Sequence, residues 1–288
     1  MTSQPTPMTQ VSFEALDISA LATATGRVAV VLEADGTMDA AGRRINKLTR
    51  GALARLAAGK DFADLKQGGL MTLAMPAGMA ADAVDVLCLS RRPSVQDARK
   101  AGAALAKVRG TADMLVAAGS TRHLADLGFG LAMRDYGFNA HKSDAKPAEG
   151  AVRIMCGKPD EVQAEAAPLM AVAEGAFFTR DLVNEPANVL TTTEFANRLE
   201  AMKDLGLTVE VLDEEQLASL GMGSLLCVGQ GSESPSKVVV MQWNGGAEGD
   251  APLALIGKGV VFDTGGISLK PAAGMEDMTM DMGGAGDV

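Results

Sequence analysis

Two hydrophobic patterns alternate along the first half of the chain. Short runs in which most residues are apolar predict buried strands, and longer stretches with apolar residues three or four positions apart predict helices. Because the two kinds of stretch follow one another, we expect an α/β domain with a largely parallel or mixed sheet. Residues 1 to about 20 are predicted to form a loose terminus. The predicted strands cover 26–36, 70–76, 83–90, 113–119 and 151–157, and the predicted helices cover 39–59, 94–110 and about 121–135.

A long helical stretch opens the second half of the chain. Apolar residues from Leu169 to Phe177 recur on one face of a helix predicted over about 160–183, although Pro168 is unfavourable in its first turns. The sequence NEPAN at 184–188 ends this pattern. The run LALIGKGVVF at 253–262 is apolar enough to be buried on both faces, as a central parallel strand is. Helices are predicted at 193–204 and 213–220, and strands at 208–212, 224–231, 237–243 and 253–262.

Length and the polar segment NAHKSDAKPAEG at 139–150 indicate how the chain divides into domains. A chain of 288 residues is long enough for two domains. The polar segment is predicted to be a surface loop near the end of the first of them. We predict an N-terminal α/β domain over 1–150, a linking strand and helix over 151–185, and a catalytic domain with a central mixed sheet over 186–288.

Composition and charge narrow the class of protein. The formal net charge is −10, which argues against a nucleic-acid partner, because nucleic-acid-binding domains usually carry a basic face. The chain begins without the basic and apolar regions of a signal peptide, and no apolar run approaches 18 residues, so we expect a cytoplasmic protein without a membrane partner. Three cysteines without a CxxC pair indicate buried, reduced thiols. With only two histidines, hydrolytic chemistry would depend on carboxylates, lysines and metal.

One segment, IGKGVVFDTGGISLKP at 256–271, combines charged residues with glycines. Lys258 interrupts the predicted strand 253–262, and a buried lysine ammonium is costly unless it is paired or neutralised. Asp263 stands at the carboxyl end of that strand, where open α/β sheets bind ligands. The sequence TGG then permits a tight turn before Lys270. The following residues add Asp281, a cluster of methionines that includes Met278, and a run of small residues.

Each of these features also has a purely structural interpretation. Lys258 fits a lysine that extends into solvent from an edge strand, Asp263 fits a turn or helix-capping aspartate, and the methionines near Met278 fit core packing. The sequence GKG does not match the phosphate-binding motif GxxxxGK[ST], because Gly259 follows the lysine, and no GxGxxG follows a strand. A lysine that binds pyridoxal phosphate fits the glycine-rich surroundings only loosely.

A divalent metal ion explains more of the segment than these alternatives. Carboxylates ligate hard or borderline divalent ions, and a nearby dication would drive Lys258 to lose its proton and ligate as a neutral amine. Asp263 and Asp281 could share one cation or a pair. Lys270 would stay charged and face a developing oxyanion, while two cations about 3.5–4 Å apart activate a water and polarise a carbonyl.

Three stretches resemble the leucyl (cytosol) aminopeptidases, a family of dinuclear metallo-exopeptidases. These stretches are NEPANVLTTTEFA (184–196), GMGSLLCVGQGS (221–232) and GKGVVFDTGGISLKPAAGMEDMTMDMGGA (257–285). The resemblance implies two divalent ions, manganese or zinc, a peptide substrate with a leucine-like first residue, and a homo-hexamer. It also implies an N-terminal α/β domain joined by a long helix to the catalytic domain.

The resemblance implies a role for each candidate residue. Lys258 matches a lysine that ligates one metal, Asp263 matches the bridging carboxylate, and Asp281 matches a further ligand of the same metal as Lys258. Lys270 matches the catalytic lysine that steadies the tetrahedral intermediate. Met278 falls where the family lines the pocket for the first side chain of the substrate.

One departure from the family pattern affects the expected activity. The family has a later NTDAEGR-like stretch with two more ligands and a catalytic arginine, and no such stretch occurs in residues 1–288. We therefore expect a chain truncated within the catalytic domain, with little or no activity by itself. The alternative function is that of a catalytically silent N-terminal fragment, which acts only as a folding, assembly or binding module.

Overall fold

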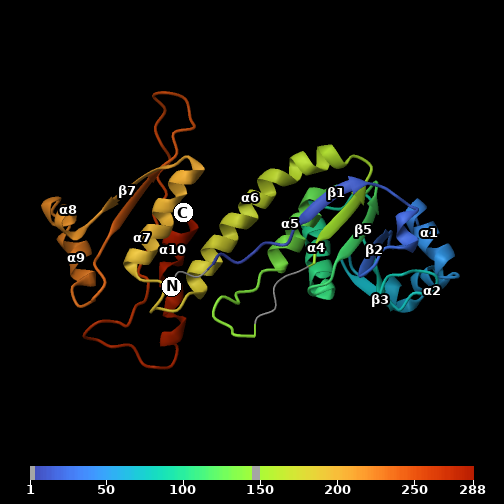
Figure 1. Cartoon of the computed structure of the whole chain (residues 1–288), viewed down its shortest axis with the longest axis horizontal. Coiled ribbons are helices and arrows are strands. Elements are labelled where there is room, and N and C mark those ends of the chain that lie inside the picture. Colours follow the sequence, from blue (N-terminus) through green and yellow to red (C-terminus); the bar gives the residue numbers. More distant parts are fainter. Residues whose placement is uncertain (1–3, 145–149) are drawn as a thin grey trace. The chain divides into compact units, whose positions relative to one another are not determined.

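The first half of the chain folds around a six-stranded mixed sheet in the order β1-β6-β5-β2-β4-β3 (Figure 1). The computed structural model describes residues 4–144 and 150–288. All strand pairs of this sheet are parallel except β3 with β4, which is antiparallel. The strands are β1 (Val11–Ala15), β2 (Arg27–Leu32), β3 (Leu70–Ala74), β4 (Ala83–Cys88), β5 (Met114–Gly119) and β6 (Val152–Cys156).

Helices cover the two faces of this sheet, and each face has its own buried core. On one face, α4 (Val95–Arg109) and α5 (Leu124–Arg134) pack on the sheet through residues such as Leu105 and Leu127. The other face is covered by the helices that follow β2 in sequence, together with a short 3-10 helix, η1. These elements are η1 (Ala20–Ala22), α1 (Ala40–Leu48), α2 (Ala52–Ala57) and α3 (Lys60–Ala63). The predicted α/β class with a mixed sheet is confirmed.

Helices α4 and α5 approach each other closely at two glycines. A Cβ atom on Gly102 would lie 1.9 Å from the carbonyl oxygen of Leu127, and one on Gly130 would lie 2.1 Å from that of Arg99. No side-chain carbon tolerates such distances, so the two glycines set the separation of the helices. Ser94 caps α4 by accepting a hydrogen bond from the Asp97 N–H, which fixes where that helix begins.

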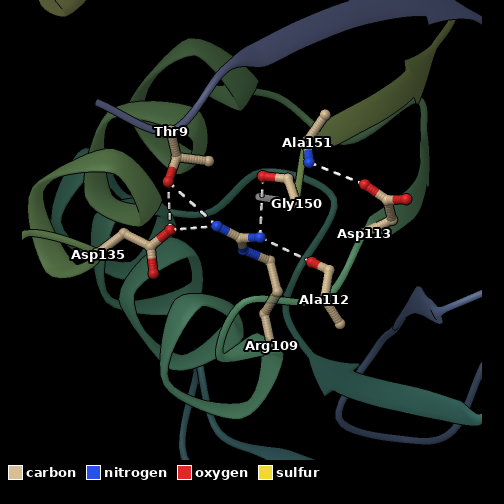
Figure 2. Close-up of polar contacts among 7 residues, drawn as sticks. All are labelled: Thr9, Arg109, Ala112, Asp113, Asp135, Gly150 and Ala151. Atoms are coloured by element: carbon tan, nitrogen blue, oxygen red, sulfur yellow. Dashed lines mark hydrogen bonds and ion pairs between the residues drawn. The ribbon is translucent and has the colours of Figure 1, made fainter. Parts of the chain in front are cut away.

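A buried arginine ties four parts of this unit together (Figure 2). Arg109, at the end of α4, is 3% exposed and forms an ion pair with Asp135, the residue that ends α5. Its Nη1 donates hydrogen bonds to the carbonyl oxygens of Ala112 at 2.6 Å and Gly150 at 3.1 Å. Its Nη2 donates to the hydroxyl of Thr9, which in turn donates to Asp135. One guanidinium thus joins the segment before β1, the ends of α4 and α5, and the start of β6.

The second compact unit begins within a long helix. The chain divides into one unit over Thr6–Phe177 and another that contains Phe178–Val288, so the division falls inside α6 (Pro159–Asn184). The core of the second unit contains Leu182, Phe195 and Met282. Its elements are α7 (Thr192–Glu200), η2 (Ala201–Leu205), β7 (Thr208–Leu212), α8 (Glu214–Ser219), α9 (Gly223–Gly229), β8 (Val238–Gln242), η3 (Met275–Met282) and α10 (Gly283–Asp287). Strands β7 and β8 pair antiparallel.

Several predicted elements differ from the structure. Strand β1 lies in the segment predicted to be a loose terminus, where it pairs with β6. The predicted helix 39–59 is broken after α1, because Arg50 and Gly51 both have positive φ, at 52° and 82°. The predicted strand 224–231 is the helix α9, and the predicted strand 253–262 has no strand structure.

The predicted domain limits stay a prediction, although two segments near them are placed. Strand β6, which the prediction put in a link between domains, lies inside the first sheet between β1 and β5. Residues 139–144 of the predicted polar loop carry no helix or strand, and residues 145–149 lie outside the described part of the chain.

Candidate functional site

Each of the two candidate lysines forms an ion pair with one candidate aspartate. Lys258 Nζ lies 2.7 Å from Asp281 Oδ1, to which it donates a hydrogen bond, and 2.6 Å from Asp281 Oδ2. Lys270 Nζ lies 2.5 Å from Asp263 Oδ2. The structure therefore brings the four charged residues together as two pairs, and all four belong to the second unit.

Close backbone contact between two glycines positions Lys258 beside Asp281. A Cβ atom on Gly257 would lie 2.1 Å from the carbonyl oxygen of Gly284, so the segment before Lys258 lies directly against the start of α10. The Ala285 N–H donates to the Lys258 carbonyl at 2.9 Å. Asp281 precedes Met282, whose side chain is fully buried in the core of the unit. The run of small residues after Met282 allows this approach.

A tight turn positions Lys270 beside Asp263. The Gly265 N–H donates to Asp263 Oδ1 at 2.8 Å, and the Lys270 N–H donates to the Thr264 carbonyl at 2.9 Å. Gly265 and Gly266 have φ values of 94° and 78°, which favour glycine. The turn predicted from the sequence TGG is confirmed.

The electrostatic field of both lysines acts on Asp263. The hydrogen bond from Lys270 lowers the pKa of Asp263 most, followed by the hydrogen bond from the Gly265 N–H, while slight desolvation opposes them. The positive charges of Lys270 and Lys258 lower this pKa further. The charge of Lys258 thus contributes to the lowered pKa of Asp263, so the two ion pairs interact electrostatically.

The environment of Lys258 differs from the predicted one. Its side chain is 59% exposed, and the apolar residues before it are exposed as well, Leu255 at 64% and Ile256 at 92%. The interpretation of Lys258 as a buried lysine in a central strand is wrong here, because residues 253–262 have no strand partner in the described part of the chain. An exposed ammonium needs no metal to neutralise it, so burial no longer argues for one.

The donor atoms of the site still suit a metal ion in part. Asp281 Oδ2 is buried and accepts no well-oriented hydrogen bond from the described residues, although Lys258 Nζ lies beside it. A carboxylate oxygen in this state beside an amine is a pair of ligands that a divalent ion accepts. Within residues 4–144 and 150–288, no three His, Cys, Asp or Glu side chains gather into a metal-sized group. The pairs therefore fit part of a coordination shell.

The remaining candidate, Met278, lies half-buried in η3, three residues before Asp281. Its role in a substrate pocket stays a prediction.

No prediction was made for Glu185, which is 1% exposed and accepts a hydrogen bond from Arg198 at 3.1 Å. Burial alone would lower the pKa of Arg198, but hydrogen bonds to Glu194 and Glu185 and the charges of both raise it. The sequence feature that could have identified Glu185 is the motif NEPAN, which places this glutamate directly after the long predicted helix.

Comparison with known proteins gives the family. Residues 177–288 match the model of the cytosol aminopeptidase family, catalytic domain. The chain is 57% identical to a probable cytosol aminopeptidase of Cereibacter sphaeroides over 275 residues, which are 96% of this chain and 56% of that protein. This chain belongs to the cytosol aminopeptidase family. The predicted family is confirmed.

Other relatives of the family agree in extent and in fold. A probable cytosol aminopeptidase of Dinoroseobacter shibae is 56% identical over 98% of this chain and 58% of its own length. The structure of a tomato leucine aminopeptidase mutant superposes with a TM-score of 0.77 at 22% identity, over 99% of this chain and 59% of that one, and shows the fold. The bottromycin maturation enzyme BotP in complex with Mn gives a TM-score of 0.64 at 27% identity, over 90% of this chain and 53% of that one. The chain thus spans 56–58% of the length of the two relatives named here.

None of the described helices has both the length and the apolar character that crossing a bilayer requires.

Proposed function

We propose that this chain carries part of the active centre of a metal-dependent aminopeptidase that releases N-terminal residues, preferentially leucine-like ones, from peptides. The observation that carries the proposal is the ion pair between Lys258 and the partly unsatisfied carboxylate of Asp281. This pair lies in the segment that matches the family's catalytic domain. Family membership supports the reaction class, and the BotP structure with Mn supports a divalent ion.

In this proposal Lys258, Asp263 and Asp281 hold divalent metal, two ions of manganese or zinc in the complete site. When bound, such ions lower the pKa of a water and polarise a peptide carbonyl. No hydrogen-bond donor other than Lys258 has to leave Asp281 Oδ2 before this oxygen binds a metal ion. Lys258 would exchange its ion pair for the metal and ligate as a neutral amine, because the charge of a dication beside it favours loss of the proton.

Lys270 is proposed to act on the substrate rather than on metal. Its side chain is 32% exposed, so the ammonium is within reach of a bound peptide. A positive charge held beside the carbonyl stabilises the oxygen as negative charge develops on it. The turn that contains Gly265 holds Lys270 next to Asp263, and Met278 would contact the first side chain of the peptide.

The wider properties of the protein follow from family membership in the same proposal. We expect a peptide substrate, a homo-hexamer for the full-length protein and a cytoplasmic location, in accord with the net charge of −10 and the names of the relatives. A second function is favoured by one observation, the exposed apolar stretch with Leu253, Leu255 and Ile256. Such a surface suits a folding, assembly or binding module without turnover.

Metal titration combined with a peptidase assay separates these functions. Calorimetric titration of the 288-residue chain with Mn²⁺ or Zn²⁺ should show saturable binding. Asp281→Asn and Asp263→Asn should each weaken this binding by about tenfold or more, as loss of groups at metal sites typically does. Lys203→Ala removes an exposed lysine paired with Glu200 outside the site and is the matched control.

Turnover of leucine amide then assigns the role of Lys270. In the full-length protein, Lys270→Ala should leave metal affinity nearly unchanged and lower turnover by about 100-fold, a typical cost of losing one group that stabilises an oxyanion. Metal binding without turnover in the full-length protein would favour the second function. Wild-type metal binding that Asp281→Asn and Asp263→Asn leave intact would contradict the proposed site.

A further inference from the structure

A small cavity lies in the first unit, at the carboxyl ends of three strands of its sheet. It encloses about 10 Å³, roughly the space of one water-sized group, and opens to solvent beyond that. The loops after β2, β4 and β5 form its walls. Its polar lining residues are Glu33, Thr37, Asp39, Arg91, Ser120 and Thr121.

The sheet topology makes this edge a natural ligand site. Strand β2 lies between β4 and β5, with which it pairs in parallel. The helices that follow β2 cover one face of the sheet, and those that follow β4 and β5 cover the other. The loops therefore diverge at β2 and leave a crevice, which is where open α/β sheets bind ligands.

One hydroxyl at this cavity, that of Thr121, has no hydrogen-bond partner among the described residues. Thr121 is 8% exposed and lines the cavity, and its N–H donates to the Ala118 carbonyl at 3.1 Å. Its side-chain oxygen makes no hydrogen bond within the part of the chain that the structure describes. Thr121 Oγ1 is not among the buried unpaired atoms of the described residues, so water can reach it from the cavity, and a polar ligand group that enters the cavity can take the place of that water.

The carboxylate of Asp39 is fixed with one oxygen available. Its Oδ1 accepts a hydrogen bond from the Gly42 N–H at 2.8 Å and so caps α1. Its Oδ2 lies against Gly119, where a Cβ atom would come within 2.3 Å of it. Gly119, with φ of 56°, thus leaves room for this oxygen at the end of β5. The result is an anionic acceptor held at the cavity wall.

The charges around the cavity have both signs. Glu33 and Asp39 are negative, and Arg91 is positive. Arg91 Nε lies 3.5 Å from Glu33 Oε1, and both side chains are partly exposed, so this ion pair is loose and can open to accept another anion. A carboxylate, a hydroxyl and a guanidinium that line one cavity form a site for a small ligand with both charges.

We propose that this cavity binds a free α-amino acid. The ammonium group, which is close to water in size, occupies the enclosed space and donates hydrogen bonds to Asp39 Oδ2 and the Thr121 hydroxyl. The carboxylate pairs with Arg91. Because the site lies wholly in the first unit, the proposal does not depend on the proposed peptidase function.

Binding of glycine by the 288-residue chain tests the proposal. Amide chemical shifts measured during titration with glycine should change in a saturable way at Thr37, Gly119 and Thr121. Methylammonium and acetate, which each carry one of the two charges, should bind at least about tenfold more weakly than glycine, because each loses one charged hydrogen-bonding group. Ca²⁺ serves as a probe for a simple cation site.

Three variants locate the binding. Asp39→Asn keeps a residue that caps helices well while it removes the charge, and Thr121→Val keeps the shape of the side chain. These two and Arg91→Gln should each weaken glycine binding by about tenfold, the value of one hydrogen bond to a charged group. Thr111→Val, at an exposed threonine before β5, should not change it.

Each remaining outcome overturns the proposal. Absence of saturable shifts with glycine would refute an amino-acid site, and so would Ca²⁺ binding in place of glycine. Glycine binding that Asp39→Asn and Thr121→Val leave unchanged, but that Asp281→Asn abolishes, would place the ligand in the candidate active site instead.

Discussion

Replacement of Arg109 by methionine tests how far one buried guanidinium stabilises the first unit. Arg109→Met keeps most of the apolar stem but removes every hydrogen bond shown in Figure 2 that the guanidinium donates. Among the described residues, Asp135 would keep its charge with only Thr9 as a side-chain partner, and the carbonyls of Ala112 and Gly150 would each lose a donor.

The expected loss is large because the ion pair is buried. The side chain of Arg109 is 1% exposed and that of Asp135 is 14% exposed. Removal of one partner from a buried pair costs about 3–5 kcal/mol in free energy of unfolding, since the other charge is left without compensation. For a unit of this size each 1 kcal/mol lowers the Tm by about 2–4 °C, so we expect a decrease of roughly 6–20 °C.

Denaturant unfolding followed by circular dichroism measures this loss, and hydrogen exchange of peptides from α4, α5 and β6 assigns it to the first unit. Lys107→Met changes an exposed lysine on the same helix and should alter stability by less than about 0.5 kcal/mol. Adding Asp135→Asn to Arg109→Met should restore about 1–2 kcal/mol, because the uncompensated charge is removed. A loss for Arg109→Met no greater than for Lys107→Met would refute the reasoning.

Further predictions concern a turn, a helix contact and a helix interior. In Lys270→Ala the pKa of Asp263, read by NMR titration, should rise towards the ordinary value, because the Lys270 hydrogen bond is the main cause that lowers it. In the wild type, the lowered pKa of Asp263 stabilises the fold above the unfolded pKa of about 3.9, and this stabilisation is lost as the pH falls through the folded pKa; a pH-independent effect of Lys270→Ala on unfolding would contradict it. Gly130→Ala should cost about 2 kcal/mol or more in chemical unfolding, because the added Cβ overlaps the Arg99 carbonyl. Gly175→Ala, where a Cβ meets no atom within 4 Å, should instead stabilise α6 by about 0.5–1 kcal/mol, and equal effects of the two substitutions would contradict the packing argument.

The central strands of the first sheet were predictable because their burial leaves a direct mark on the sequence. All residues of β4 and β5 are buried, and their runs are almost wholly apolar. Strand β1 lies at the sheet edge, pairs only with β6 among the described strands, and has a mixed pattern that resembles a loose terminus. The apolar run of α9 is too short to distinguish a strand from a helix by its pattern alone.

The candidate site was predictable in its residues but not in its geometry. The family motif identified the two lysines and two aspartates and assigned Lys258 and Asp281 to one metal, and the structure pairs these two residues. The motif gave no partner for Lys270, which the structure pairs with Asp263. The predicted burial of Lys258 rested on an apolar run, and an apolar run shows that a segment favours burial without showing what covers it. The cavity beside Thr121 could not be predicted because its residues come from three separate loops, each of which reads as an ordinary turn.

The pairing of β1 with β6 has a consequence for synthesis of the chain on the ribosome. Val11 pairs with Val152, so the first strand of this sheet finds its partner only after the rest of the sheet has been translated. At about 5–20 residues per second, this delay is on the order of ten seconds. During that time β2, β4 and β5 can already associate, whereas β1 stays unpaired. The nascent chain therefore exposes β1 as an unpaired strand until Val152 leaves the exit tunnel. A chaperone that binds β1 would act within that interval.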